Sequence, residues 1–156
     1  MLIRKFKETD AIDVSNLMAK TLRITNKDDY SKEYIEDLIN RLTPQNILDN
    51  SRDSSFYVIE EDGNIVACGA IGPYLDKEDE TYLFSIFVDP KYQKRGLGKK
   101  IIETIESDDL FLKSSRIVVP ASLTAVDFYL RLGYKYSNNE RIIDNNGLIE
   151  LEKFNN

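Results

Sequence analysis

The sequence predicts a single α/β domain covering residues 1–156, in which helices and strands are interspersed along the chain. Length is the first reason, because 156 residues fit one domain and allow a substantial buried core. Composition is the second, since 42% of the residues are hydrophobic and 31% are charged, as in ordinary globular proteins. The third is that runs with the period of a strand and runs with the period of a helix follow one another along the chain.

The chain begins with one predicted strand and two predicted helices. Residues 2–6 alternate in the manner of a strand. Thr9 or Asp10 can cap a helix that continues to about Lys20. A second helix is predicted over residues 31–42, where the apolar residues follow helical spacing.

A loop, a hairpin and a central strand are predicted next. Pro44 and the polar stretch 49–55 indicate a loop within the domain. Residues 56–60 and 65–71 are predicted strands, joined by an Asp-Gly turn that tolerates positive φ. The run 81–88 contains few polar residues, which favours a central strand covered on both faces.

The last part of the chain alternates between helices and strands. A helix with an apolar stripe is predicted from Leu97. Residues 116–119 form a predicted short strand, and residues 122–132 a predicted helix that ends at Gly133. The alternating run 148–154 is the last predicted strand.

Composition excludes several kinds of site. The chain has no histidine and one cysteine, Cys68, so neither a disulfide within the chain, a zinc site nor a Cys/His or Ser/His nucleophile pair is expected. Cys68 lies in an apolar run, which favours a small buried side chain. The net charge of −6 argues against general binding to nucleic acid.

Targeting signals and membrane spans are not expected either. The first ten residues are charged where a signal peptide requires an apolar core, and no run approaches the ~20 apolar residues of a membrane span. We therefore expect a cytoplasmic protein without a membrane partner.

One short segment concentrates positive charge in this acidic chain. The stretch "DPKYQKRGLGKK" (89–100) carries five cationic side chains and two glycines between the central strand and the helix from Leu97. The first amides of a helix are unpaired and lie at the positive end of its dipole, so such a terminus binds phosphate. Gly96 and Gly98 allow close approach of the backbone to an anion. A solvated basic helix start, with glycines serving only the turn, is the simpler alternative.

Neither common nucleotide fingerprint fits this segment. The dinucleotide pattern requires a third glycine where the chain has Ile101, and the phosphate-loop pattern of nucleotide hydrolases requires four residues between its glycines and a Lys-Ser/Thr pair. A phosphate or pyrophosphate ligand is therefore expected from another cofactor.

Two motifs in the right order resemble the GNAT superfamily of N-acetyltransferases. "QKRGLG" (93–98) fits its Gln/Arg-x-x-Gly-x-Gly/Ala signature, and "VPASLTAVDFYLRLGYK" (119–135) is similar to its C-terminal motif. The match spans roughly residues 54–136. The resemblance implies a mixed, mostly antiparallel central sheet of about six to seven strands, flanked by about four helices.

The resemblance also implies how acetyl-CoA binds, with no metal. The backbone of the signature segment would hold the coenzyme pyrophosphate. The main chain of a bulged strand before it would bind the pantetheine arm and the thioester carbonyl, whose developing charge a donor would stabilise. Ser122 stands where many members have asparagine, and can be a coenzyme contact, an N-cap, or both. The implied coenzyme-binding residues are Ile86, Phe87, Val88, Gln93, Lys94, Arg95, Gly96, Leu97, Gly98, Lys99, Ser122 and Tyr129.

Three residues are candidates for acid and base chemistry. Tyr129 matches the family's tyrosine that protonates the leaving thiolate, although it can also be a core aromatic. Members often place a glutamate on the strand before the signature, and this chain has Tyr82 near that place and Glu80 two residues earlier. Glu80 is a candidate base and Tyr82 a candidate water-mediated relay. A solvated strand start is the simpler interpretation of Glu80.

The resemblance implies an acetyl-CoA-dependent N-acetyltransferase acting on a primary amine, favoured as a small molecule, by direct attack in a ternary complex. The acidic stretch 27–37 can attract cationic amines such as polyamines or aminoglycosides, or can simply confer solubility. A non-catalytic acyl-CoA-binding or regulatory domain, and a protein N-terminal or lysine acetyltransferase, remain alternatives. A homodimer is also open, since dimers are frequent in the family.

Overall fold

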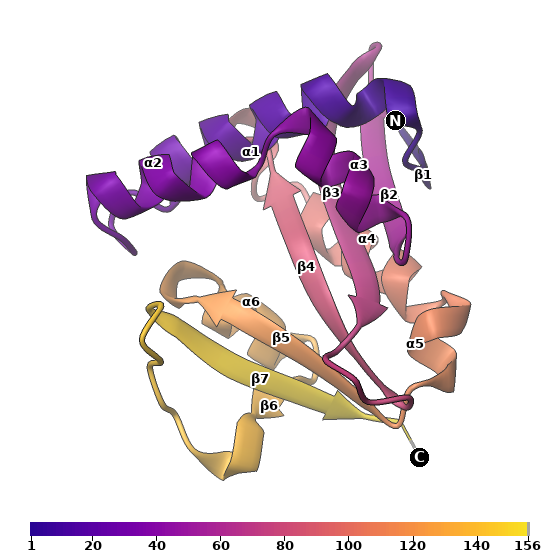
Figure 1. Ribbon diagram of the computed structural model, residues 1–156, viewed down its shortest axis with the longest axis vertical. Coiled ribbons are helices and arrows are strands. Elements are labelled where there is room, and N and C mark those ends of the chain that lie inside the picture. Colours follow the sequence, from indigo (N-terminus) through magenta and orange to yellow (C-terminus); the bar gives the residue numbers. More distant parts are fainter. Residues whose placement is uncertain (156) are drawn as a thin grey trace.

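The computed structural model describes residues 1–155 as a seven-stranded sheet with helices on both faces (Figure 1). The strand order is β1-β2-β3-β4-β5-β7-β6, and β4 and β5 are parallel while the other neighbours are antiparallel. This confirms the mixed, mostly antiparallel α/β fold. The strands are β1 (Leu2–Lys5), β2 (Ser55–Glu61), β3 (Asn64–Pro73), β4 (Glu80–Val88), β5 (Arg116–Ser122), β6 (Lys135–Tyr136) and β7 (Leu148–Phe154).

Six α-helices surround the sheet in the described chain, rather than about four. Two of them, α3 and α5, were not predicted from the sequence. The helices are α1 (Ala11–Thr25), α2 (Lys32–Arg41), α3 (Pro44–Ser51), α4 (Leu97–Glu106), α5 (Asp109–Lys113) and α6 (Val126–Arg131).

The segment around Pro44 is a helix, so the loop predicted to begin there is wrong for its first part. Proline is favourable at the first position of a helix because its missing N–H would have no partner there. Thr43 caps α3 by accepting a hydrogen bond from the amide of Asn46. Ile47 of α3 is buried and packs in the same core cluster as residues of α1.

The hairpin of β2 and β3 has the predicted turn and sorts its side chains to two faces. Asp62 and Gly63 both have positive φ, as a tight hairpin turn requires. Along β2, Phe56 packs in the cluster that contains α1, whereas Ile59 packs in the cluster that contains α4. The sheet is therefore covered by α1 and α3 on one face and by α4 and α5 on the other.

The predicted stripe of α4 is fully buried against the sheet. Leu97, Ile101, Ile102 and Ile105 are at most 3% exposed. Gly69 of β3 allows this packing, since a Cβ atom there would lie 2.4 Å from Ile101 Cγ2. The glycine is thus required by the close approach of α4 to the sheet.

The C-terminal elements differ in extent from the predicted ones. β5 continues to Ser122, a 3₁₀ turn covers Leu123–Ala125, and α6 begins only at Val126, so the helix predicted from residue 122 starts too early. β6 has two residues, too few for a pattern in the sequence. No helix within residues 1–155 is both long and apolar enough to cross a membrane.

Candidate active site

The site lies where β4 and β5 separate. In the described chain the two strands pair only over Glu80–Tyr82 and Arg116–Val118, and beyond that point they diverge (Figure 1). The gap holds a cavity of about 870 Å³, which extends from the start of α4 to α2. The edge of β4 that faces this gap has no strand beside it, so its backbone groups are available to a ligand.

A bulge in β4 directs its backbone toward the cavity. Ser85 has a φ of 55°, and the pairing register between β3 and β4 shifts opposite this residue. Cys68 lies beneath the bulge and donates a hydrogen bond from its thiol to the carbonyl of Ser85 at 3.2 Å. The thiol is completely buried, and burial raises its pKa to about 12, so it remains a protonated small core side chain.

The basic segment between β4 and α4 forms a concave backbone loop. Lys94 and Gly96 have φ of 63° and 80°, a left-handed conformation that turns neighbouring amides to one side. The amide of Lys100 makes the hydrogen bond to the Gly96 carbonyl that starts α4, at 3.0 Å. The amides of Leu97, Gly98 and Lys99 precede it and have no acceptor within the helix.

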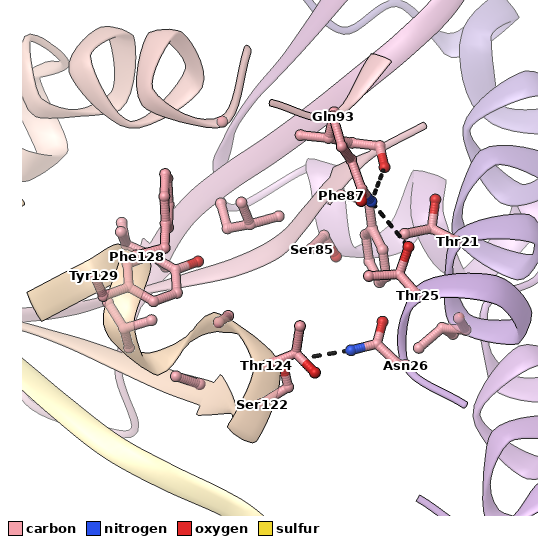
Figure 2. A pocket seen from close by; sticks show the side chains of 18 of the residues that line it. Thr21, Thr25, Asn26, Ser85, Phe87, Gln93, Ser122, Thr124, Phe128 and Tyr129 are labelled. Atoms are coloured by element: carbon pink, nitrogen blue, oxygen red, sulfur yellow. Dashed lines mark hydrogen bonds between the residues drawn. The ribbon is translucent and has the colours of Figure 1, made fainter. Parts of the chain in front are cut away.

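The side chains of Phe128 on α6 and of Gln93 in the loop after β4 shape the beginning of α4. A Cβ atom at Gly98 would lie 3.1 Å from the ring of Phe128, so glycine lets the helix start pack tightly on α6. The side-chain amide of Gln93 donates to Thr25 Oγ1 at 2.8 Å and to the Val88 carbonyl at 3.1 Å (Figure 2). Gln93 therefore ties the loop to the end of α1 through its side chain.

Tyr129 combines a buried ring with a hydroxyl that faces the cavity. The residue is 4% exposed, and its ring lies edge-on to Phe128 and Tyr134. Figure 2 shows the hydroxyl pointing into the space between α6 and β4. Burial raises the pKa of Tyr129, so the phenol stays protonated at neutral pH.

A polar clasp joins the end of α1 to the end of β5 across the cavity. Asp29 accepts hydrogen bonds from the Thr124 hydroxyl at 2.7 Å and from the Thr124 amide at 3.1 Å. The side chain of Asn26 donates to Asp29 at 2.8 Å and to the Ser122 hydroxyl at 3.4 Å (Figure 2). Ser122 makes no capping hydrogen bond with its side chain.

Most residues predicted for the site line this one cavity. These are Ile86, Phe87, Val88, Gln93, Lys94, Gly96, Leu97, Gly98, Lys99, Ser122 and Tyr129. Arg95 is not among the lining residues, since its guanidinium lies over the Tyr92 ring, 5.0 Å from the ring centre. It therefore contributes charge near the loop rather than a wall of the cavity.

The two residues suggested for base chemistry lie outside the cavity. Glu80 sits at the paired end of β4, where Arg116 donates to its carboxylate at 2.8 Å and lowers its pKa. Tyr82 packs between Tyr74 and Phe84, and burial raises its pKa. A carboxylate that is already paired and a phenol that does not face the cavity are poorly placed to take a proton there.

The sequence did not predict the wall opposite the basic loop that precedes α4. It consists of Thr21, Leu22, Thr25 and Asn26 of the α1 end, with Tyr30, Tyr34, Leu38 and Leu42 of the next segment. The spacing of Tyr34, Leu38 and Leu42 was the available signal, but it indicates an apolar face without saying whether core or ligand covers it. Within residues 1–155 no group of three or more metal-ligating side chains is present.

Comparison with known proteins places the chain among acetyltransferases. A family model described as an acetyltransferase (GNAT) domain matches residues 26–153. The amino-acid acetyltransferase of Pseudomonas syringae pv. syringae is 34% identical over 113 residues, which make up 68% of this chain and 26% of that protein. The chain thus spans about a quarter of the length of this curated relative.

Solved structures share the whole fold. The PaiA N-acetyltransferase of Thermoplasma acidophilum, in complex with coenzyme A, superposes with a TM-score of 0.80 at 18% identity, covering 99% of this chain and 98% of that chain. The ribosomal-protein-alanine N-acetyltransferase of Brucella melitensis gives a TM-score of 0.73 at 19% identity, covering 99% of both chains. At such identities the likeness concerns the fold alone.

Proposed function

Because the chain belongs to the GNAT acetyltransferase family, we propose that it transfers an acetyl group from acetyl-CoA to a primary amine of a small molecule, by direct attack in a ternary complex. One observation carries the proposal. The free amides at the start of α4 and the hydroxyl of Tyr129 line the same cavity. Its volume of about 870 Å³ lies within the range of small-molecule sites.

The coenzyme pyrophosphate binds at the loop before α4. The amides of Leu97, Gly98 and Lys99 have no acceptor within the helix, and the helix dipole adds positive potential. Lys94 and Lys99 line the cavity and supply charge to the phosphates. Arg131 lies one turn after Phe128 on α6 and so belongs to the same end of the cavity.

The pantetheine arm follows the bulged end of β4 into the gap between the strands. Backbone groups of Ile86, Phe87 and Val88 lie along this path. The Val88 carbonyl already accepts a hydrogen bond from Gln93, which leaves this carbonyl less available to the ligand. An N–H of the bulge that meets the thioester oxygen stabilises the charge that develops as the amine attacks.

Tyr129 acts as the acid when the thioester is cleaved. The amine nitrogen forms a bond to the carbonyl carbon, and the bond from that carbon to sulfur breaks. The Tyr129 hydroxyl gives its proton to the departing thiolate and recovers one released by the amine nitrogen, so the products are an amide and free coenzyme A. Its raised pKa keeps the proton in place until negative charge develops on sulfur.

A second candidate function is favoured by one observation. Within residues 1–155, no carboxylate lines the cavity, so no general base is at hand to deprotonate an amine. A non-catalytic acyl-CoA-binding domain would retain the phosphate loop without needing such a base.

The coenzyme loop is tested by calorimetric titration with acetyl-CoA, with coenzyme A and ATP as comparison ligands. We expect the wild type to bind acetyl-CoA and coenzyme A. Gly96→Glu should lower the affinity for both by more than about 100-fold, because bulk and negative charge enter the phosphate site. Gly63→Glu is the matched control. Both glycines have φ near 80° and open space around them, but Gly63 lies in the β2–β3 hairpin turn.

The outcomes separate the candidate functions. Weakened binding in Gly96→Glu but not in Gly63→Glu supports the phosphate loop, and release of thiol with an amine supports the transferase. Binding without turnover on any amine favours the non-catalytic domain. Equal affinity for acetyl-CoA in a folded Gly96→Glu variant would refute the loop.

A further inference from the structure

The wall of the cavity farthest from the coenzyme loop is an apolar stripe on α2 and its end. Tyr34, Leu38 and Leu42 are spaced four residues apart, so they project from one side of the helix. All three line the cavity and are neither fully buried nor fully exposed. A ligand in the cavity therefore meets an aromatic ring and two aliphatic side chains there.

Other elements complete this wall with further apolar groups. Tyr30 packs against Tyr34, with ring centres 5.1 Å apart, and also lies against the turn at Gly147. Phe84 of β4 and Leu148 of β7 line the same cavity. Burial raises the pKa of Tyr30 to about 12, so its hydroxyl is neutral at physiological pH.

The acidic side chains nearby are directed elsewhere. Asp29 is held by Thr124 and Asn26 in the clasp, and Glu36 of α2 is paired at 2.8 Å with Arg23 of α1 in an exposed ion pair. Neither lines the cavity, and neither does any other acidic residue of the described chain. The carboxylates of segment 27–37 therefore make no direct contact with the cavity, although the negative charge of Asp29 lies close enough to Tyr30 to help raise the pKa of that phenol.

The cations that line the cavity all belong to its coenzyme end. They are Lys94, Lys99 and Arg131, which surround the start of α4 and the adjacent face of α6. No charged residue of the described chain lines the end near α2. A second charged group on the acceptor, of either sign, would lose its hydration there without gaining a partner.

We propose that the acceptor is a monoamine carried on an aromatic or branched aliphatic group, with no second charge. This inference rests on the proposed function and names the acceptor class of the same site. The apolar wall binds the body of the acceptor, with Tyr30, Tyr34 and Leu38 as its main contacts. An apolar surrounding also favours the neutral form of the amine, which is the form that attacks, and so replaces the missing base.

The test compares kcat/KM for three acceptors at saturating acetyl-CoA, monitored by thiol release. 2-Phenylethylamine is an apolar monoamine, spermidine a polycation, and phenylalanine adds a carboxylate to the same aromatic body. We expect kcat/KM for 2-phenylethylamine to exceed kcat/KM for each of the other two acceptors by at least about tenfold. A preference for spermidine or phenylalanine would overturn the proposal.

A charge placed in the wall should change this selectivity. Leu38→Glu puts a carboxylate where the acceptor body binds. We expect it to raise the ratio of kcat/KM for spermidine to kcat/KM for 2-phenylethylamine by about tenfold or more. Asn40→Glu is the matched control, since it adds the same charge to an exposed position of the same helix. An equal change of selectivity in both variants would contradict the proposed wall.

Acetyl-CoA titration keeps this test separate from that of the proposed function. If Leu38→Glu binds acetyl-CoA like the wild type, the variant is folded and its selectivity can be compared directly. If the wild type binds acetyl-CoA but turns over none of a wide panel of amines, the transferase function fails and the acceptor class fails with it. If it turns over amines but prefers charged ones, only the acceptor class fails.

Discussion

The two ends of the β4–β5 pair differ in how they use charge. At the paired end, Arg116 lies among three carboxylates, with Glu80 and Glu152 at 2.8 Å and Glu150 at 3.3 Å. At the separated end the cavity is lined by cations, uncharged polar groups and apolar groups, without a carboxylate among the described residues. Carboxylates therefore stabilise the paired end of the two strands, whereas none of the described carboxylates lines the gap at the separated end.

The paired end of the two strands contributes to stability, whereas the separated end offers groups to a ligand. The Arg116 side chain is 19% exposed and satisfies carboxylates from three strand positions, which is typical of a structural network. The separated end instead leaves backbone amides and the Tyr129 hydroxyl available to a ligand. A glutamate on the strand before a coenzyme motif can therefore serve the stability of the sheet rather than catalysis.

The largest expected effect concerns the paired end. Arg116→Met should lower the free energy of unfolding by about 3 kcal/mol, because it leaves partly buried carboxylates without their partner. Urea denaturation measures this loss. Arg23→Met removes an exposed ion pair and should cost less than about 1 kcal/mol. Equal losses in the two variants would contradict the structural role of the network.

A change of one hydroxyl group at the separated end should affect rate rather than binding. Tyr129→Phe should lower kcat by about 100-fold with little change in the affinity for acetyl-CoA, since it removes the acid and keeps the ring. Steady-state kinetics with titration of the coenzyme checks both. Tyr82→Phe is the matched control and should retain most of the activity, because Tyr82 does not line the cavity. A similar loss in both variants would remove the assignment of Tyr129.

The smallest effect is expected for Glu80→Gln. If Glu80 is structural, kcat of this variant should stay within about threefold of the wild-type value. Its stability should change with pH in a defined direction. The hydrogen bond from Arg116 lowers the pKa of Glu80 in the folded chain. The carboxylate thus stabilises the fold above its unfolded pKa of about 4.3, and this contribution is lost as pH falls through the lower folded value.

Denaturation between neutral and acidic pH measures that contribution. The wild type should lose stability on acidification more steeply than Glu80→Gln. Glu78→Gln, at an exposed position two residues earlier, should follow the wild type. A large loss of kcat in Glu80→Gln with unchanged stability would instead restore Glu80 as the base.

Local patterns were sufficient to predict the elements on either side of the basic loop before α4. The stripe from Leu97 to Ile105 predicted α4, and the Asp-Gly pair predicted the hairpin turn, because each depends on neighbours in sequence. The glycines and cations around Gly96 lie between β4 and α4, where the signature predicted them. These features need no knowledge of distant contacts.

Long-range contacts explain what the sequence could not predict. Glu80 is held by Arg116, 36 residues away, and Asp29 is held by Thr124, 95 residues away. The sequence suggested Glu80 as a base and counted Asp29 among the acids of segment 27–37, and only the tertiary fold shows the partners to which both carboxylates are hydrogen-bonded. The helix at Pro44 was missed for a different reason, since proline both starts helices and marks loops.

Hydrogen exchange with and without acetyl-CoA tests the central claim most directly, because it reports on both ends of the strand pair in one sample. We predict that the coenzyme slows exchange of the amides in segments 85–88 and 96–99, and leaves segments 80–82 and 116–118 unchanged. Protection confined to the paired end, or no change in the amides at the start of α4 with acetyl-CoA bound, would contradict the assignment of the separated end as the coenzyme site.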